Sequence, residues 1–162
     1  MSIRAFIFIL VFTGLSATTF GQCYIKSTDQ SEGHITYYLD PELVAQTSEM
    51  GIAMSVQMVG NQYYLAITYQ FAKLAEPLEE KVAIELQNGY ILELDMYTMQ
   101  VANAGGVELT LAVFNLETDQ MDYFTKSYLK SVRFNTQPGL KHNVTVSVNH
   151  NVLVRQLKCF GK

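Results

Sequence analysis

The segment from Gly51 to Phe71, GIAMSVQMVGNQYYLAITYQF, alternates apolar and polar residues on both sides of a Gly60-Asn61 pair. This alternation is typical of strands with one buried face, and Gly-Asn suits the tight turns that match strand twist. A turn at these two residues predicts the pairs Met58 with Tyr63, Val56 with Leu65, Met54 with Ile67 and Ile52 with Tyr69. The opposite face is small and polar, and we expect it to meet solvent or a partner. Its residues are Ala53, Ser55, Gln57, Ala66, Thr68 and Gln70.

A second hairpin is predicted in KVAIELQNGYILELDM, from Lys81 to Met96. A two-residue Asn-Gly turn would mix its apolar and polar faces, whereas a three-residue loop at 87–89 keeps them separate. That loop pairs Leu86 with Tyr90, Ile84 with Leu92, Val82 with Leu94 and Lys81 with Asp95. Gly89 then occupies a left-handed bulge position, which glycine adopts without steric cost.

Further alternation predicts strands at 107–113, 129–135 and 144–148. The tail at 151–159 fits either a short helix or a continued strand. With the two hairpins, about six strands are expected at this spacing. The sequence therefore predicts a mainly β fold: an antiparallel β-sandwich or partly open barrel with one short helix near residues 118–128.

The predicted helix at 118–128 begins after a β-strand, and Thr118 is the expected cap. Met121, Phe124 and Tyr128 would share one face of it. We expect that face to contact the core of the domain.

The two cysteines of the chain, Cys23 and Cys159, lie close to the two ends of the expected mature protein. In an oxidising compartment, such a pair is most simply one disulfide. Pairing of one cysteine with another chain is the alternative. No Cys-x-x-Cys motif is present, so thiol redox chemistry is not expected.

The N-terminus, residues 1–21, has the pattern of an export signal, with Arg4 before an apolar run and small residues at its end. The run is too short to cross a bilayer as a helix, which needs about 20 residues. We expect removal of this signal and one β-rich domain at 22–162 without a transmembrane segment. The ending resembles bacterial envelope signals, which predicts a periplasmic, secreted or surface-associated protein. A lipid anchor at Cys23 is less favoured, because lipoprotein signals need a small residue where this chain has Gln22.

The balance of charge restricts the partners. The chain has 11 Lys and Arg against 15 Asp and Glu, and removal of Arg4 with the signal leaves 10 − 15 = −5. Nucleic acid binding depends on clustered basic residues, so it is not expected. A polybasic membrane-surface site is disfavoured for the same reason.

No familiar catalytic, phosphate-binding or dinucleotide motif occurs, so we predict no enzyme activity and no cofactor. His34, His142 and His150 lack neighbours at ligand spacing, and no metal site is predicted. Glu85 and Glu93 are weak acid–base candidates, because the hairpin register places them diagonally on one strand face. The alternative interpretation is a solvated strand face with separated like charges.

The ten tyrosines and nine phenylalanines raise the question of a ligand site. In the pairs Tyr37-Tyr38 and Tyr63-Tyr64, consecutive rings point to opposite strand faces. Tyr38 and Tyr64 are therefore candidate ligand contacts, although such tyrosines commonly rim a core.

Taken together, these features favour a non-catalytic exported envelope protein that serves as an interaction or accessory module. Another envelope protein is the expected partner, because polar strand faces and sheet edges suit protein contacts. The alternatives are a glycan-binding or small-ligand-binding β-sandwich module and a hydrolase of unrecognised type.

Overall fold

The computed structural model describes residues 23–29, 35–137 and 139–162. The predicted export signal, Gln22 and His34 lie outside the described residues. Within them, the chain forms ten strands in one antiparallel sheet and two short helices. The strands are β1 (Lys26–Asp29), β2 (Ile35–Tyr38), β3 (Glu42–Gln46), β4 (Met50–Val59), β5 (Gln62–Phe71), β6 (Leu78–Leu86), β7 (Ile91–Ala104), β8 (Val107–Leu116), β9 (Leu129–Thr136) and β10 (Leu140–Thr145). The helices are α2 (Thr118–Lys126) and α3 (Val152–Cys159).

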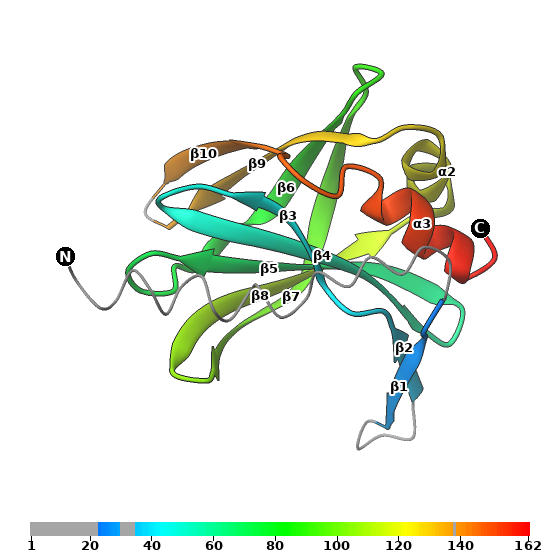
Figure 1. The fold of residues 1–162 in the computed structure, drawn as a ribbon, viewed down its shortest axis with the longest axis horizontal. Helices are drawn as coiled ribbons and strands as arrows, with labels where there is room; N and C mark the ends of the chain where they lie inside the picture. The colour runs from blue at the N-terminus through cyan, green and yellow to red at the C-terminus, as the bar shows by residue number, and fades with distance from the viewer. Residues whose placement is uncertain (1–22, 30–34, 138) are drawn as a thin grey trace.

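The strand order is β1-β2-β4-β5-β8-β7-β6-β9-β10, and β3 pairs with β4 beside β2. The 14-residue strand β7 joins two leaves of the sheet, since its first part pairs with β6 and the rest pairs with β8. Figure 1 shows β6 running across the direction of β4 and β5, with the β1–β2 hairpin projecting from the body. The mainly β, antiparallel fold predicted from the sequence is confirmed.

The core lies between the two leaves. The ring of Tyr69 on β5 meets that of Phe134 on β9, with centroids 4.7 Å apart. Helix α2 adds the buried Met121 and Phe124, and α3 adds Val152, Leu153 and Leu157. The two helices contact each other at one end of the sheet, beside the C-terminus (Figure 1).

Both predicted hairpin registers are confirmed. The Gly60-Asn61 turn produces all four predicted cross-strand pairs of β4 and β5. In the second hairpin, the Leu86 N–H donates to the Tyr90 carbonyl at 2.8 Å, and Gly89 has φ of +90°. Alternation and turn chemistry are local properties, so they specify these pairings without knowledge of the remaining fold.

Helix α2 differs from its prediction at both ends. The side chain of Gln120 closes its first turn by accepting the Glu117 N–H at 2.9 Å, so Thr118 is not the cap. Tyr128 lies beyond the helix and is 48% exposed. Its carbonyl accepts the Gln87 N–H, which draws this segment into the sheet instead of the helix.

Other corrections concern the sheet. The described residues contain ten strands where about six were expected, and the short β1, β2 and β3 were not predicted because they lack a readable alternation. The last strand ends at Thr145, so Val148 is exposed. The tail forms helix α3. Ser55 and Ala66, which lie opposite each other on β4 and β5, are buried rather than solvent-facing, because short side chains in the middle of a sheet expose little surface.

The two ends of the chain are joined by the predicted disulfide between Cys23 and Cys159, whose Cα atoms are 5.4 Å apart. This bond links the start of the described chain to the last residue of α3. It closes a loop with a sequence separation of 136 residues.

Helix α3 also completes the edge of β4. On this edge β2 pairs with β4 up to Gln57, and β3 pairs with β4 from Met54 back to Gly51. The N–H of Val56 lies between these ladders and donates to Gln156 Oε1 at 2.7 Å. The Nε2 of Gln156 donates to the Asp40 carbonyl at 3.2 Å. A helix side chain therefore takes the place of a missing strand partner.

The two free ends of the bent sheet approach each other without forming a ladder. The N–H groups of Ser147 and Val148 donate to the Val44 carbonyl at 2.9 and 3.2 Å. Asn149 Nδ2 donates to the Leu43 carbonyl at 2.9 Å. No strand pairing joins β3 to β10 in the described part of the chain, so the sheet stays open.

Candidate functional site

A row of polar and aromatic side chains crosses the outer face of the first leaf. Residues directly opposite each other in antiparallel strands project from the same face. Tyr38 of β2 lies opposite Gln57 of β4, Gln57 lies opposite Tyr64 of β5, and Tyr64 lies opposite Asn115 of β8. We call these four residues, together with Tyr97, the tyrosine row. It brings the two sequence-predicted ligand contacts, Tyr38 and Tyr64, onto one face.

Tyr97 was not identified from the sequence. Its ring contacts that of Tyr64, with centroids 5.2 Å apart and planes tilted by 49°. It lies at a register shift in β7, since Met96 pairs with Phe114 while Met99 pairs with Ala112. In a regular strand, side chains on one face are an even number of positions apart. Met96 and Met99 both pack against the core but are three positions apart, which indicates an extra residue between them. The shift leaves Tyr97 on the surface, 64% exposed.

The tyrosine row carries no charged side chain. Lys26, which lies opposite Tyr38, is neutralised by Asp40 through an ion pair of 2.6 Å, and this hydrogen bond raises the pKa of Lys26. Burial, with a smaller contribution from Tyr97, raises the pKa of Tyr64. The phenol of Tyr64 is therefore neutral at physiological pH.

Within the described part of the chain, the amides of the tyrosine row have unused hydrogen-bonding capacity. The side chains of Gln120 and Gln156 donate to backbone carbonyls within the protein. Those of Gln57 and Asn115 have no hydrogen-bond partner among residues 23–29, 35–137 and 139–162, although both are half-buried. An amide offers both donors and an acceptor, so these groups can bind a polar ligand.

The predicted acid–base candidates lie on the second leaf. Glu85 accepts hydrogen bonds from Lys130 at 2.6 Å, Arg133 at 2.5 Å and Ser131 at 3.1 Å. These partners lower the pKa of Glu85 from 4.5 to about 2. A carboxyl group that ionises so readily is unsuited to donate a proton near neutral pH. The register does place Glu93 diagonally from it, and the acid–base role stays a prediction.

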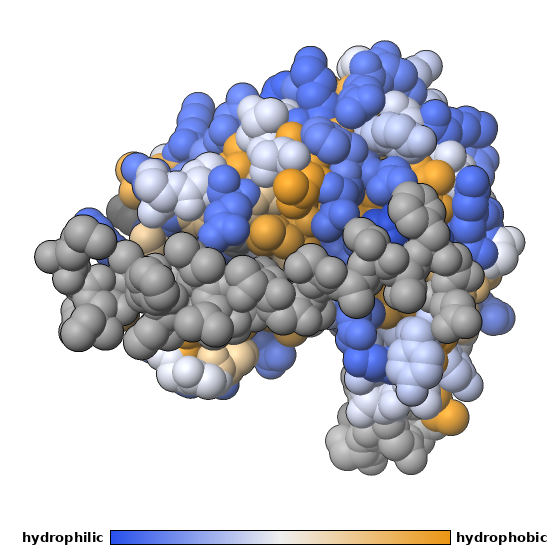
Figure 2. Space-filling view, viewed as in Figure 1, coloured by the Kyte–Doolittle hydropathy of each residue, from blue (hydrophilic) through white to orange (hydrophobic). Residues whose placement is uncertain are grey.

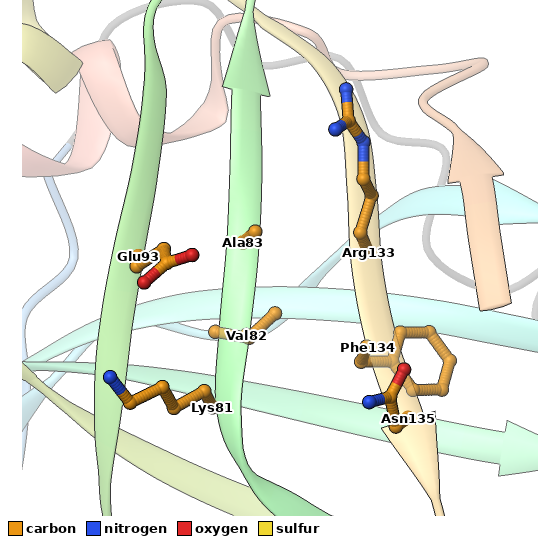
Figure 3. A pocket seen from close by; sticks show the side chains of 7 residues that line it. All are labelled: Lys81, Val82, Ala83, Glu93, Arg133, Phe134 and Asn135. Atoms are coloured by element: carbon orange, nitrogen blue, oxygen red, sulfur yellow. The ribbon is translucent and has the colours of Figure 1, made fainter. Parts of the chain in front are cut away.

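A hollow of about 180 Å³ lies over Ala83, between Glu93 and Arg133. Figure 3 shows Glu93 directed toward Ala83, while the guanidinium of Arg133 extends along its own strand, away from Glu93. The remaining lining residues are Lys81, Val82, Phe134 and Asn135. Pockets that enclose small ligands usually measure about 300 Å³ or more, so this hollow suits no more than a small group.

Exposed apolar side chains occur on several elements, and four of them lie in or next to the β1–β2 hairpin: Tyr24, Ile25, Ile35 and Tyr37. The most exposed come from different elements and include Leu74, Val101 and Leu140. On the visible described surface in Figure 2, apolar areas are interrupted by hydrophilic side chains. Isolated apolar residues are normal on a protein surface and do not define an interface.

The described histidines take part in packing. His142 stacks on Phe134 with centroids 4.9 Å apart, and His150 Nδ1 lies 3.1 Å from the Leu129 carbonyl. Nowhere in the described ranges do three or more His, Cys, Asp or Glu residues form a group that could hold a metal ion. Neither of the two described helices is long and apolar enough to cross a membrane.

The chain was compared with known proteins by sequence and by structure. No protein-family model, no curated protein and no solved structure matches it.

Proposed function

We propose that the protein is a non-catalytic binding protein of the bacterial cell envelope, and that it holds another envelope component on the tyrosine row. The observation that carries this proposal is the row itself. It assembles neutral aromatic and amide side chains from five strands on one exposed sheet face. Tyrosine provides large, rigid contact area with a polar tip and is common in binding surfaces.

The disulfide supports the location. Structural disulfides persist in oxidising compartments, such as the periplasm or the cell surface. The Cys23–Cys159 bond joins the two ends of the domain and is compatible with export. An export signal at residues 1–21 would deliver the chain there.

Two features of the second leaf favour binding over hydrolysis. Glu85 is held ionised by Lys130 and Arg133, whereas a hydrolase of the two-carboxylate type needs one carboxyl group with a raised pKa. The hollow beside Glu93 is also too small to enclose a substrate. The outer face of the first leaf is the better binding surface.

The test is photo-crosslinking in the native host. A photoreactive amino acid replaces Tyr97 in the tagged full-length chain, and the matched control carries it at Tyr128, an exposed tyrosine outside the row. We expect an adduct at position 97 that disappears when Tyr64→Ala is added, and none at position 128. Equal labelling at both positions, or no adduct at position 97, would contradict the proposal.

A further inference from the structure

The chemistry of the tyrosine row indicates which component it binds. Building on the proposed function, we infer that the ligand is an uncharged, extended carbohydrate chain that lies across strands β2, β4, β5 and β8. Sugar rings have apolar C–H faces that stack on aromatic rings, and hydroxyl edges that exchange hydrogen bonds with amides. Along the row the side chains alternate in this way: ring, amide, ring, amide.

The spacing of the row suits a linear ligand. Neighbouring strands lie about 4.8 Å apart, so Tyr38 and Tyr64, with Gln57 between them, are separated by roughly 10 Å. This is comparable to the length of a disaccharide in an extended chain. From Tyr38 to Asn115 the row spans roughly 14 Å, a length that several sugar units would cover.

Charge complementarity selects a neutral ligand. The row consists of tyrosine and amide side chains only and contains no Asp, Glu, Lys or Arg. The cation at the β1 end of the row is already paired with Asp40. An acidic polysaccharide or a phosphorylated ligand would meet no unpaired cation along these strands within the described residues.

The amides provide the directional contacts. Gln57 and Asn115 flank Tyr64 on the two adjacent strands. A hydroxyl group can donate to the amide oxygen and accept from the amide nitrogen, and a ring on Tyr64 would lie between the two amides. Tyr97, tilted against Tyr64, adds a second aromatic surface on the side of β7.

The experiment uses the full-length, disulfide-bonded protein purified from the host envelope. Affinity gel electrophoresis measures its retardation by soluble neutral linear polysaccharides: β-glucans, xylan, mannan and glycol chitin. Calorimetry with oligosaccharides of increasing length then tests the best of them. We expect affinity to rise with length until the row is covered.

The variants separate the row from other tyrosines. Tyr64→Ala and Tyr97→Ala should each weaken binding by roughly tenfold, as expected for loss of one stacked ring. Tyr90→Ala and Tyr128→Ala, at exposed tyrosines outside the row, should leave binding unchanged. Gln57→Leu keeps the approximate volume but removes the amide, and it should also weaken binding. Because Tyr97 is largely exposed, its variant tests the site even if Tyr64→Ala impairs folding.

Three results would overturn this inference. Binding that is unaffected by every row variant would place the carbohydrate elsewhere. Absence of binding across the panel, together with a protein adduct at position 97, would replace the carbohydrate with a protein partner and leave the proposed function intact. Absence of both binding and adduct would refute the inference and the proposed function together.

Discussion

Replacement of Gln156 by methionine tests whether one helix side chain completes the sheet edge. Gln156 is 3% exposed, and its Oε1 accepts the N–H of Val56. Methionine has a similar volume and no strong acceptor, so the N–H would remain buried without a partner. Because the other main contact is to the carbonyl of the exposed Asp40, water can replace it.

The expected loss of folding stability follows from leaving the N–H of Val56 without an acceptor. A buried backbone N–H without a partner costs about 1–3 kcal/mol, and we expect about 2 kcal/mol here. For a domain of this size, that corresponds to a decrease of roughly 4–8 °C in Tm. Urea unfolding of the oxidised protein measures the free energy of unfolding, and Gln100→Met on an exposed strand position is the control, with an expected change within about 0.5 kcal/mol.

Gln156→Glu gives a second, pH-dependent readout. It retains an acceptor for Val56 but places a buried carboxyl group beside Glu42, whose Oε1 lies 3.3 Å from Gln156 Nε2. Burial and the like charge raise the pKa of the introduced carboxyl group in the folded state. Its destabilising effect should be complete above that pKa and diminish as the pH falls and the group is protonated. If Gln156→Met unfolds at the wild-type urea concentration, Gln156 does not complete the edge of β4.

Four further predictions concern stability. Reduction of the disulfide should lower the free energy of unfolding by about 5 kcal/mol, because it releases a loop of 136 residues, and urea unfolding with and without reductant measures this. Glu85 has a lower pKa in the folded state than its ordinary value of 4.5, so its stabilising contribution is present above that value and is lost between about pH 4.5 and 2. Acid titration of Glu85→Gln should therefore show a smaller loss of stability in that window, and an unchanged acid transition would contradict the ion-pair assignment. Phe124→Ala should cost roughly 3–5 kcal/mol, because this ring is fully buried, whereas Tyr128→Ala should change stability by less than about 0.5 kcal/mol; equal effects in thermal unfolding would refute the corrected helix boundary. Tyr69→Phe removes a buried hydroxyl that has no partner among the described residues, and it should raise the free energy of unfolding by about 1 kcal/mol; a loss of stability would reveal a partner for that hydroxyl.

The hairpins were predictable because their determinants are local. A two-residue turn at Gly60 and a three-residue loop ending at Gly89 each leave one register in which apolar side chains meet. The boundaries of α2 were less predictable, since the carbonyl of Tyr128 accepts the N–H of Gln87, which directly follows β6 and lies 41 positions away in sequence (128 − 87 = 41). Contacts of that kind leave no trace in a local pattern.

The candidate site likewise combines features that are visible in the local sequence with features that depend on distant strands. Tyr38 and Tyr64 were identifiable as aromatic residues on strand faces, but their common face depends on β2 pairing with β4. Asn115 joins them only because β8 lies beside β5. The place of Tyr97 in the row depends on a register shift in β7. The only indication of that shift in the sequence is the three-residue spacing of Met96 and Met99.

By itself, the sequence determined the β-rich class and the two hairpin registers, because residue period and turn chemistry act over a few residues. It favoured the Cys23–Cys159 bond because the chain has only these two cysteines, and the structure joins them. Only the tertiary structure decided the strand order, the role of Gln156 and the assembly of the tyrosine row. The physical reason is that strand pairing uses backbone groups common to every residue, so many orders satisfy the same hydrogen bonds. The order is selected by which complete arrangement buries the apolar faces of both leaves in one core.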